Sequence, residues 1–323
     1  MDAFRIHLLR YRGEVVSPLR LPFAAGAAIR GALFGTLRRQ FCMAGRGAGC
    51  GRPDVVADCP VCFLLAPVDE ADRRGRDVPR PYVLRPPLRG PTSYASGQTF
   101  EFEMATFGRA LSHFPYALLG VEEMGRAGMG ETRQGSFRLD EVWAINPVQG
   151  RSESVYQRSG DATVRPPNLP ISEADVLGAA ATLAASGGAS SLRLALDSPT
   201  RLVEAGKLVK PETFTFRTFF ARLLERVTAL AGRYGGCPPP ADVPQLLSMA
   251  AAVQIVERRL AWVEVFRGSA RHQRALPMGG LGGDVTIRGE LTPFLPWLVW
   301  GTLTHVGKDA AMGNGRYRVE LEG

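Results

Sequence analysis

The chain contains two copies of the same ending: an apolar helix, a glycine-containing loop and a basic strand. The later copy lies within residues 278–320 and carries glycines 307, 313 and 315 in its loop. The earlier copy lies within residues 111–142 and carries glycines 125, 128 and 130, followed by Arg133. Internal similarity of this kind is typical of a duplicated structural unit. The sequence therefore predicts two related domains, each with a glycine-rich loop near its end.

The order of the predicted elements supports the duplication. In the first half, alternation from Phe4 predicts a strand, apolar four-residue steps predict a helix over 24–41, and strands follow at 99–107 and 137–145. In the second half, alternating leucines at 192–196 predict a strand, and an apolar stripe over 216–230 predicts a helix. Each half reads strand–helix–strand–strand–helix–strand, so we expect an α+β fold of two tandem ferredoxin-like (RRM-like) domains.

The expected domain boundaries follow from composition. Residues 1–150 form the N-terminal domain, with a Cys-rich insertion at about 42–100 that is rich in Gly, Pro and Arg. Residues 151–190 read as a linker whose Ala-rich later part is helical, and residues 191–323 form the C-terminal domain. Inside the C-terminal domain we predict a helix over 245–259 and a strand over 262–266.

The charge favours an anionic partner. Thirty-nine Lys and Arg face 31 Asp and Glu, which gives a net charge of +8 and a pI near 9.6. Most of the cations are arginine, whose planar fork of donors matches phosphate. Charge alone leaves nucleic-acid binding and simple solubility as alternatives. No signal peptide opens the chain, and the longest apolar run, 294–300, is too short to span a bilayer. We expect a cytoplasmic protein without a membrane partner.

Four of the five cysteines crowd into 21 residues: Cys42, Cys50, Cys59 and Cys62. The last two form a C-x-x-C pair, a spacing that suits tetrahedral coordination of zinc by thiolates. The alternative is a set of reduced cysteines in a long loop. We predict a structural zinc, because the insertion is poor in packing residues and a metal would order it.

Six segments in a fixed order give the chain a family resemblance. They are AAIRGALFGTLRR at 27–39, CPVCFLLAP at 59–67, FGRALSHFPYALLGVEEMGRAGMG at 107–130, LDSPTRLVEAGKLV at 196–209, WVEVFRGSARHQRALPMGGLGGDVTIRGEL at 262–291 and THVGKDAAMGNGRYRVE at 304–320. With them, nearly the whole chain resembles the CRISPR-associated pre-crRNA-processing endoribonucleases of the RAMP superfamily. The resemblance implies binding of CRISPR repeat RNA and cleavage by the ribose 2′-OH without a catalytic metal, leaving a cyclic phosphate. The implied partners are repeat RNA or crRNA and other CRISPR effector subunits.

The catalytic residue is the point where the chain departs from that family. Family members often carry a catalytic histidine on or near the first helix, and residues 24–41 contain none. Histidine is the natural general base near neutral pH. We therefore consider His305, which precedes the second glycine loop, and His113, at the start of a helix, as catalytic candidates; each has a helix-capping role as its alternative. A non-catalytic RAMP subunit that holds crRNA remains the alternative function.

The predicted RNA contacts are basic residues near the first helix and the second glycine loop. They are Arg30, Arg38, Arg271, His272, Arg274, Lys308 and Arg316. The loop at 307–316 is also expected to offer backbone N–H groups to phosphate. A nucleotide-binding P-loop is excluded, because five residues separate Gly301 from Gly307 and Asp309 follows Lys308. Glycines that serve packing alone remain the alternative for both loops, more so for the first.

Overall fold

The computed structural model describes residues 4–43, 59–67, 78–88, 93–160, 163–236, 241–269 and 274–322. The chain divides into two compact units. The N-terminal unit comprises Ile6–Pro170, and the C-terminal unit comprises Ile171–Gly323 together with the first residues up to Arg5. Phe4 shows why the start of the chain belongs to the later unit: it is buried, and its ring packs 5.2 Å from that of Trp300.

The N-terminal unit is built on a five-stranded antiparallel sheet with the order β3-β5-β1-β6-β7. Its strands are β1 (Ile6–Ser17), β3 (Tyr82–Arg85), β5 (Thr99–Phe107), β6 (Ser136–Asn146) and β7 (Arg151–Gln157), with a short pair β2 (Leu19–Arg20) and β4 (Ser93–Tyr94). Its helices are α1 (Ala25–Phe41), α3 (Pro60–Leu65) and α4 (Phe114–Ala127), and a 3₁₀ turn at Gly108–His113 leads into α4. Without β7, this is the ferredoxin-like order.

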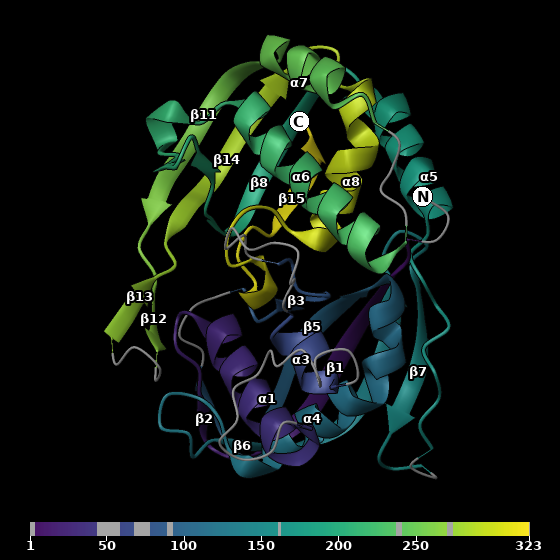
Figure 1. Ribbon diagram of the computed structural model, residues 1–323, viewed down its shortest axis with the longest axis vertical. Helices are drawn as coiled ribbons and strands as arrows, with labels where there is room; N and C mark the ends of the chain where they lie inside the picture. The colour runs from purple at the N-terminus through teal and green to yellow at the C-terminus, as the bar shows by residue number, and fades with distance from the viewer. Residues whose placement is uncertain are drawn as a thin grey trace. The chain divides into compact units, whose positions relative to one another are not determined.

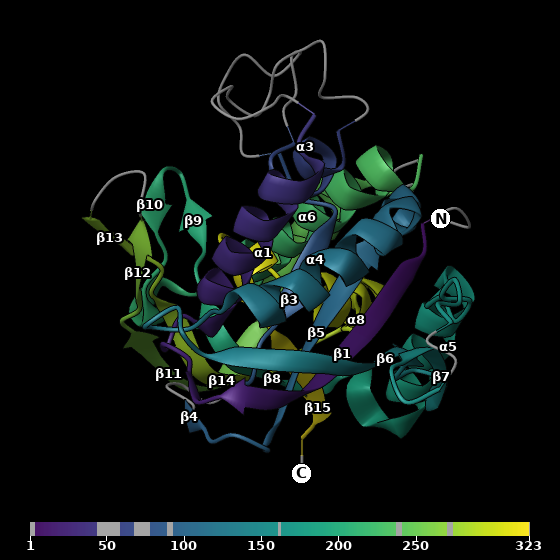
Figure 2. The same ribbon diagram turned by 90° about the horizontal axis from the view of Figure 1, so that it is seen from below.

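Helices α1 and α4 pack directly against each other in this unit (Figure 2). The apolar positions Ile29, Leu33 and Leu37 of α1 are buried, as their four-residue spacing predicts. Gly120 of α4 faces them, and a Cβ there would lie 2.7 Å from Leu37 Cδ2. The glycine thus permits the close approach of the two helices.

The C-terminal unit repeats the plan with a four-stranded antiparallel sheet in the order β11-β14-β8-β15. These strands are β8 (Ser191–Thr200), β11 (Gln254–Val263), β14 (Gly280–Arg288) and β15 (Tyr317–Leu321). Its helices are α5 (Glu173–Leu183), α6 (Phe216–Tyr234), α7 (Val243–Ala252) and α8 (Leu295–Thr304) (Figure 1). Two hairpins extend it: β9 (Val203–Glu204) with β10 (Lys207–Leu208), and β12 (Phe266–Ser269) with β13 (Arg274–Pro277).

The core of the C-terminal unit lies between its sheet and α6 and α8. Every position of the predicted apolar stripe on α6 is buried: Phe216, Phe219, Phe220, Leu223, Leu224, Val227 and Leu230. The Tyr317 hydroxyl on β15 donates to the Leu298 carbonyl of α8 over 2.8 Å. Burial raises the pKa of Tyr317 well above its ordinary value, so the hydroxyl stays a donor. The two tandem ferredoxin-like domains expected from the sequence are therefore present.

Two expectations about element boundaries differ from the structure. The helix predicted over 245–259 ends as α7 at Ala252, and residues 254–263 form β11 instead. These residues pair with β14, and the pairing begins with Gln254 opposite Arg288. This pairing overrides the helical pattern of the sequence. The predicted linker 151–190 contains β7, which pairs with β6, and α5, which contacts α8. The division between the units falls after Pro170.

None of the helices in the described ranges is long and apolar enough to cross a membrane.

Gly301 on α8 allows Tyr317 to reach its partner, and this generates a stability prediction. A Cβ at Gly301 would overlap the Tyr317 hydroxyl and lie 2.5 Å from Leu223 Cδ1. We expect Gly301→Ala to lower the free energy of unfolding by about 1–3 kcal/mol through overpacking. Gly178→Ala on α5 is the matched control, since nothing lies within 4 Å of its Cβ position. There, alanine should stabilise by about 0.5–1 kcal/mol. Urea denaturation followed by circular dichroism measures the unfolding free energy of each variant. Equal changes in Gly301→Ala and Gly178→Ala would contradict the overpacking at Gly301.

Candidate functional site

The second glycine loop joins α8 to β15 and closes tightly on its own backbone. Val306 N–H donates to the Gly315 carbonyl over 3.0 Å, and Gly315 N–H donates to the Pro199 carbonyl over 3.1 Å. Gly315 has φ of 72°, and a Cβ there would overlap the Val306 carbonyl. Only glycine fits that position.

The loop is also pinned to the end of β8. Lys308 N–H donates to the Arg201 carbonyl over 2.9 Å, and Arg316 N–H donates to Ser198 Oγ over 2.9 Å. The amides of Met312 and Gly313 donate within the loop itself. Five of the ten N–H groups in residues 307–316 are engaged in these contacts, so at most half of them are available to a phosphate. The side chains of Lys308, which is exposed, and Arg316, which is half-buried, are what the loop presents.

His305 is an internal anchor of this loop. It has no exposed surface, and its Nδ1 lies 3.1 Å from the Asn314 carbonyl. The Asn314 amide in turn donates to the Met278 carbonyl over 2.8 Å. A side chain enclosed in this way cannot reach a substrate atom. The geometry therefore argues against His305 as the general base and assigns it to holding the loop together.

The first glycine loop is explained by packing. Glu131 N–H donates to the Arg20 carbonyl of β2 over 2.9 Å. Gly130 has φ of 90°, and a Cβ there would lie 2.5 Å from the same carbonyl. Arg133, which follows, is exposed. The duplicated motif thus serves a close backbone contact in this unit.

His113 is held at the start of α4 by two neighbours. Its Nδ1 lies 3.0 Å from Ser112 Oγ, and its ring stacks on Phe63 with centroids 4.2 Å apart and planes within 5°. Arg109 lies over the same phenyl ring, 5.5 Å from its centroid. Tyr116, one turn along α4, lies 6.2 Å from the imidazole. An aromatic and basic cluster therefore surrounds a half-buried histidine.

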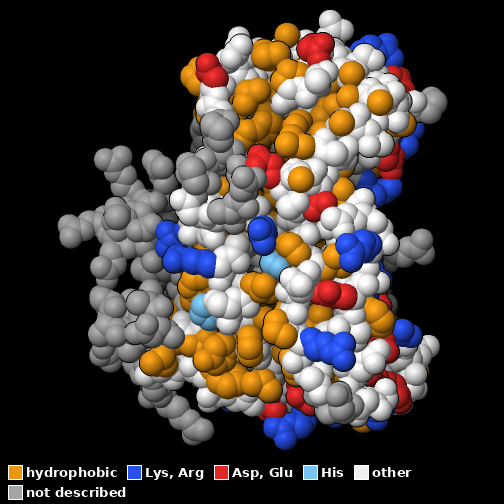
Figure 3. Space-filling view, turned by 90° about the vertical axis from the view of Figure 1, so that its right-hand side faces the viewer, with side chains coloured by type: hydrophobic (Ala, Val, Ile, Leu, Met, Phe, Trp, Pro, Cys, Tyr) orange, Lys and Arg blue, Asp and Glu red, His pale blue; other side chains and the backbone are white. Residues whose placement is uncertain are grey.

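The electrostatics of this cluster favour a neutral imidazole. Burial lowers the pKa of His113, and the charge of Arg109 lowers that pKa further. A neutral imidazole at pH 7 is the form that accepts a proton. Among the described histidines, His7 and His305 are buried and His113 alone is partly exposed. One face of the molecule carries histidine among basic and apolar side chains (Figure 3).

The other predicted contacts lie in different surroundings. Arg30 has a structural role, because it donates to the Leu65 carbonyl of α3 over 3.1 Å and also interacts with Tyr82. Arg38 is exposed in the last turn of α1. Arg274 begins β13, where its backbone pairs with Ser269. Arg271 and His272 lie outside the described residues.

The described cysteines lie at two helix ends. Cys42 follows α1 and is half-buried, whereas Cys59 and Cys62 at the start of α3 are fully buried; Cys50 lies outside the described residues. Burial raises the pKa of the Cys59 thiol, but backbone N–H groups of Met43, Cys62 and Val61 outweigh that effect and lower it. Such an environment suits a thiolate ligand. In the part of the chain described, no three His, Cys, Asp or Glu side chains are already arranged around a metal position.

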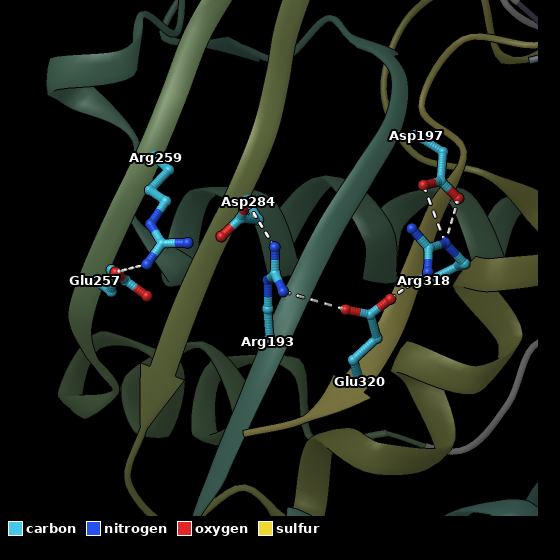
Figure 4. A network of polar contacts seen from close by, with 7 residues as sticks. All are labelled: Arg193, Asp197, Glu257, Arg259, Asp284, Arg318 and Glu320. Atoms are coloured by element: carbon cyan, nitrogen blue, oxygen red, sulfur yellow. Dashed lines mark hydrogen bonds and ion pairs between the residues drawn. The ribbon is translucent and has the colours of Figure 1, made fainter. Parts of the chain in front are cut away.

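The open face of the C-terminal sheet is covered by ion pairs (Figure 4). Arg193 on β8 bridges Asp284 on β14, at 2.9 Å, and Glu320 on β15, at 3.8 Å. Arg318 lies 3.0 Å from both oxygens of Asp197. The labelled network, which also contains Glu257 paired with Arg259, has three cations and four anions and no aromatic ring. This face lacks the stacking rings with which RRM-type sheets bind RNA.

Comparisons with known proteins agree with the fold. Residues 4–169, just over half of the chain, match the AF_1859_N family, described as an N-terminal domain. Residues 194–317 match the family of the CRISPR-associated endoribonuclease Cas6. No curated protein sequence matches the chain.

Several solved structures share the fold at low sequence identity. A Cas6 product complex has a TM-score of 0.55 and 15% identity, covering 97% of this chain and 98% of that one. Thermus thermophilus Cas6 has a TM-score of 0.53 and 13% identity, with 98% of each chain covered. A partial Cas6-RT-Cas1–Cas2 complex has a TM-score of 0.58 and 12% identity over 99% of this chain, which spans only 46% of that longer chain.

The family matches and the duplicated fold lead to one assignment. The two matched regions together extend across both ferredoxin-like units, and the Cas6 match includes the second glycine loop. The chain belongs to the family of the AF_1859_N domain, which spans just over half of it, and its residues 194–317 are similar to the family of the CRISPR-associated endoribonuclease Cas6.

Proposed function

We propose that this protein is an endoribonuclease that binds CRISPR repeat RNA and cleaves pre-crRNA to mature crRNA. The match of residues 194–317 to the Cas6 endoribonuclease family supports the substrate class. The half-buried His113, with its lowered pKa, is the observation that supports catalysis. This function implies repeat RNA and other CRISPR proteins as partners. It also implies that the protein acts in the cytoplasm.

The proposed chemistry needs no metal at the scissile phosphate. A base removes the proton of the 2′-OH, the 2′ oxygen attacks phosphorus, and the 5′ oxygen leaves with a proton from an acid. The products are a 2′,3′-cyclic phosphate and a 5′-hydroxyl. His113 is the proposed base, and Arg109, on the preceding 3₁₀ turn, supplies positive charge for the phosphorane.

His113 also offers a spatial replacement for a histidine on the first helix. Phe41 ends α1, and its ring lies 5.2 Å from that of Tyr116. Tyr116 lies 6.2 Å from His113. The imidazole therefore stands beside the C-terminal end of α1, although it comes from the start of α4.

The alternative function is a non-catalytic RAMP subunit that holds crRNA. The absence of histidine from α1 supports it, as does the Phe63 ring that covers one face of the His113 imidazole. The two functions differ in one observable, which is strand cleavage.

A cleavage assay in EDTA tests the role of His113. The wild type should cut its cognate repeat RNA, and a 2′-deoxy substitution at the scissile nucleotide should abolish cutting. His113→Ala should slow cleavage by on the order of 10²–10⁴. Arg126→Ala, in the last turn of the same helix, is the matched control. A wild-type rate in His113→Ala would exclude this residue as the base, and an inert wild type that still binds repeat RNA would favour the alternative function.

The pH dependence of the same assay tests the environment of His113. A base must be neutral, so the rate should rise with pH through the pKa of His113, and the midpoint of the rise should lie below the ordinary imidazole value of about 6.5. Arg109→Ala removes a charge that lowers this pKa, so the rise should move to higher pH. An unchanged midpoint in Arg109→Ala, or a rate that falls across this range, would contradict the role of base.

Lys308 and Arg316 are the proposed phosphate contacts of the glycine loop, and Arg271, His272 and Arg274 remain predicted contacts. In the described chain, neither Lys308 nor Arg316 lies within ion-pair distance of a carboxylate. Lys308→Ala and Arg316→Ala should each reduce the slope of log affinity against log salt by about 0.7, the value for one single-stranded phosphate contact. Arg259→Ala is the control, because Glu257 already neutralises that cation. Fluorescence anisotropy of RNA binding at several salt concentrations provides the slopes. Unchanged slopes in correctly folded variants would rule out phosphate contacts by Lys308 and Arg316.

A structural zinc held by Cys42, Cys50, Cys59 and Cys62 is a further part of the proposal. The buried C-x-x-C pair and the lowered pKa of Cys59 support it. Protein purified without chelator should contain about one zinc per chain. Cys59→Ser and Cys62→Ser should lose the metal and melt at lower temperature, whereas Cys237→Ser should keep it. Elemental analysis and thermal melting measure both, and metal-free wild type with normal folding would refute the zinc.

A further inference from the structure

Lysine has an unusual distribution in this chain. Only three of the 39 cations are lysines, namely Lys207, Lys210 and Lys308, and all belong to the C-terminal unit. All three are exposed, and within the described ranges none forms an ion pair with a carboxylate. The arginines on the sheet face of the same unit are instead neutralised by ion pairs. The positive charge of these three lysines is therefore not neutralised by a carboxylate of the described residues.

A chain of contacts joins the glycine loop to a tryptophan. Lys308 N–H donates to the Arg201 carbonyl, and the Arg201 guanidinium donates to the Gly279 carbonyl over 2.9 Å. Gly279 lies against Trp262, because a Cβ there would be 3.2 Å from the indole nitrogen. Lys210 completes the series, with its ammonium 3.7 Å from the centre of the Trp262 ring. This series of contacts thus links the exposed Lys308 of the loop to the exposed Lys210 beside the end of β11.

Two short hairpins adjoin this series of contacts along the chain. Lys207 belongs to the β9–β10 hairpin, and Phe266, which begins β12, is 60% exposed. The Lys210–Trp262 contact joins the segment that follows β10 to the end of β11, which leads into β12. We call the set formed by Arg201, Lys207, Lys210, Trp262, Phe266 and Lys308 the lysine strip.

Cations beside an exposed phenyl ring and a half-buried indole, one face of which Lys210 covers, suit one class of ligand. Single-stranded nucleic acid presents phosphates to the cations and unstacked base faces to the rings, whereas a duplex hides its bases. We infer that the lysine strip binds an unpaired stretch of the RNA that continues from the phosphates at the glycine loop, with bases stacking on Trp262 and Phe266. This inference rests on the proposed function for its ligand. It adds a single-stranded, base-stacking segment to the substrate.

A double-mutant cycle with abasic RNA tests the stacking. Repeat RNAs that each lack one base at a single unpaired position are titrated against the wild type, Trp262→Leu and Phe266→Ser. Loss of the stacked base should weaken wild-type binding by about 5- to 150-fold. The same abasic RNA should bind Trp262→Leu or Phe266→Ser no more weakly than intact RNA does. Phe266 is exposed, so its variant keeps the test valid if Trp262→Leu does not fold.

The outcomes separate the two proposals. If the wild type binds and cleaves repeat RNA but no abasic position couples to Trp262 or Phe266, the lysine strip is not a stacking site and the proposed function stands. If the wild type binds no repeat RNA, both are overturned. Coupling at one or two neighbouring positions, with Arg259→Ala behaving as wild type, is the result we expect.

Discussion

The C-terminal unit depends on one close backbone contact, the approach of the α8–β15 loop to the end of β8. Val306, Lys308, Gly315 and Arg316 all donate hydrogen bonds that close this loop or attach it to residues 198–201. The contact is possible because glycine at 315 leaves room for the Val306 carbonyl. His305 is enclosed beneath it. As a result at most half of the N–H groups in residues 307–316 stay available to an anion, and the side chains of Lys308 and Arg316 are the loop's other contribution to such a site.

Among the described residues of the C-terminal unit, charged side chains are paired on the open face of the sheet and unpaired at the three lysines. Arginines on the open sheet face are paired across strands, as with Arg193 between Asp284 and Glu320. Exposed pairs of this kind contribute little to stability, but they leave no net positive field for a polyanion. The lysines near the glycine loop have no such partners in the described chain. Net charge therefore says less about RNA binding than the location of the unpaired cations.

The sequence predicted the fold well wherever local pattern and tertiary packing agree. The buried stripes of α1 and α6 and the strands β5, β6 and β8 lie at or near their predicted positions. The prediction failed at residues 254–259, which read as helix but form the start of β11. Those residues are largely exposed, so no buried stripe marks their period, and their strand conformation comes from pairing with a distant partner, β14.

The sequence by itself determined the duplicated plan, because glycine spacing and apolar periodicity reflect local steric and burial requirements, and its six ordered motifs carried the family resemblance. The roles of individual polar residues were decided only by tertiary structure. His305 and His113 both stand next to helix ends in the sequence, yet one is enclosed and the other is partly exposed beside Phe63 and Arg109. Arg30 and Lys308 are both cations, yet Arg30 donates to the Leu65 carbonyl, whereas the Lys308 side chain is exposed. Burial and partners depend on residues far apart in the chain, and no local pattern records them.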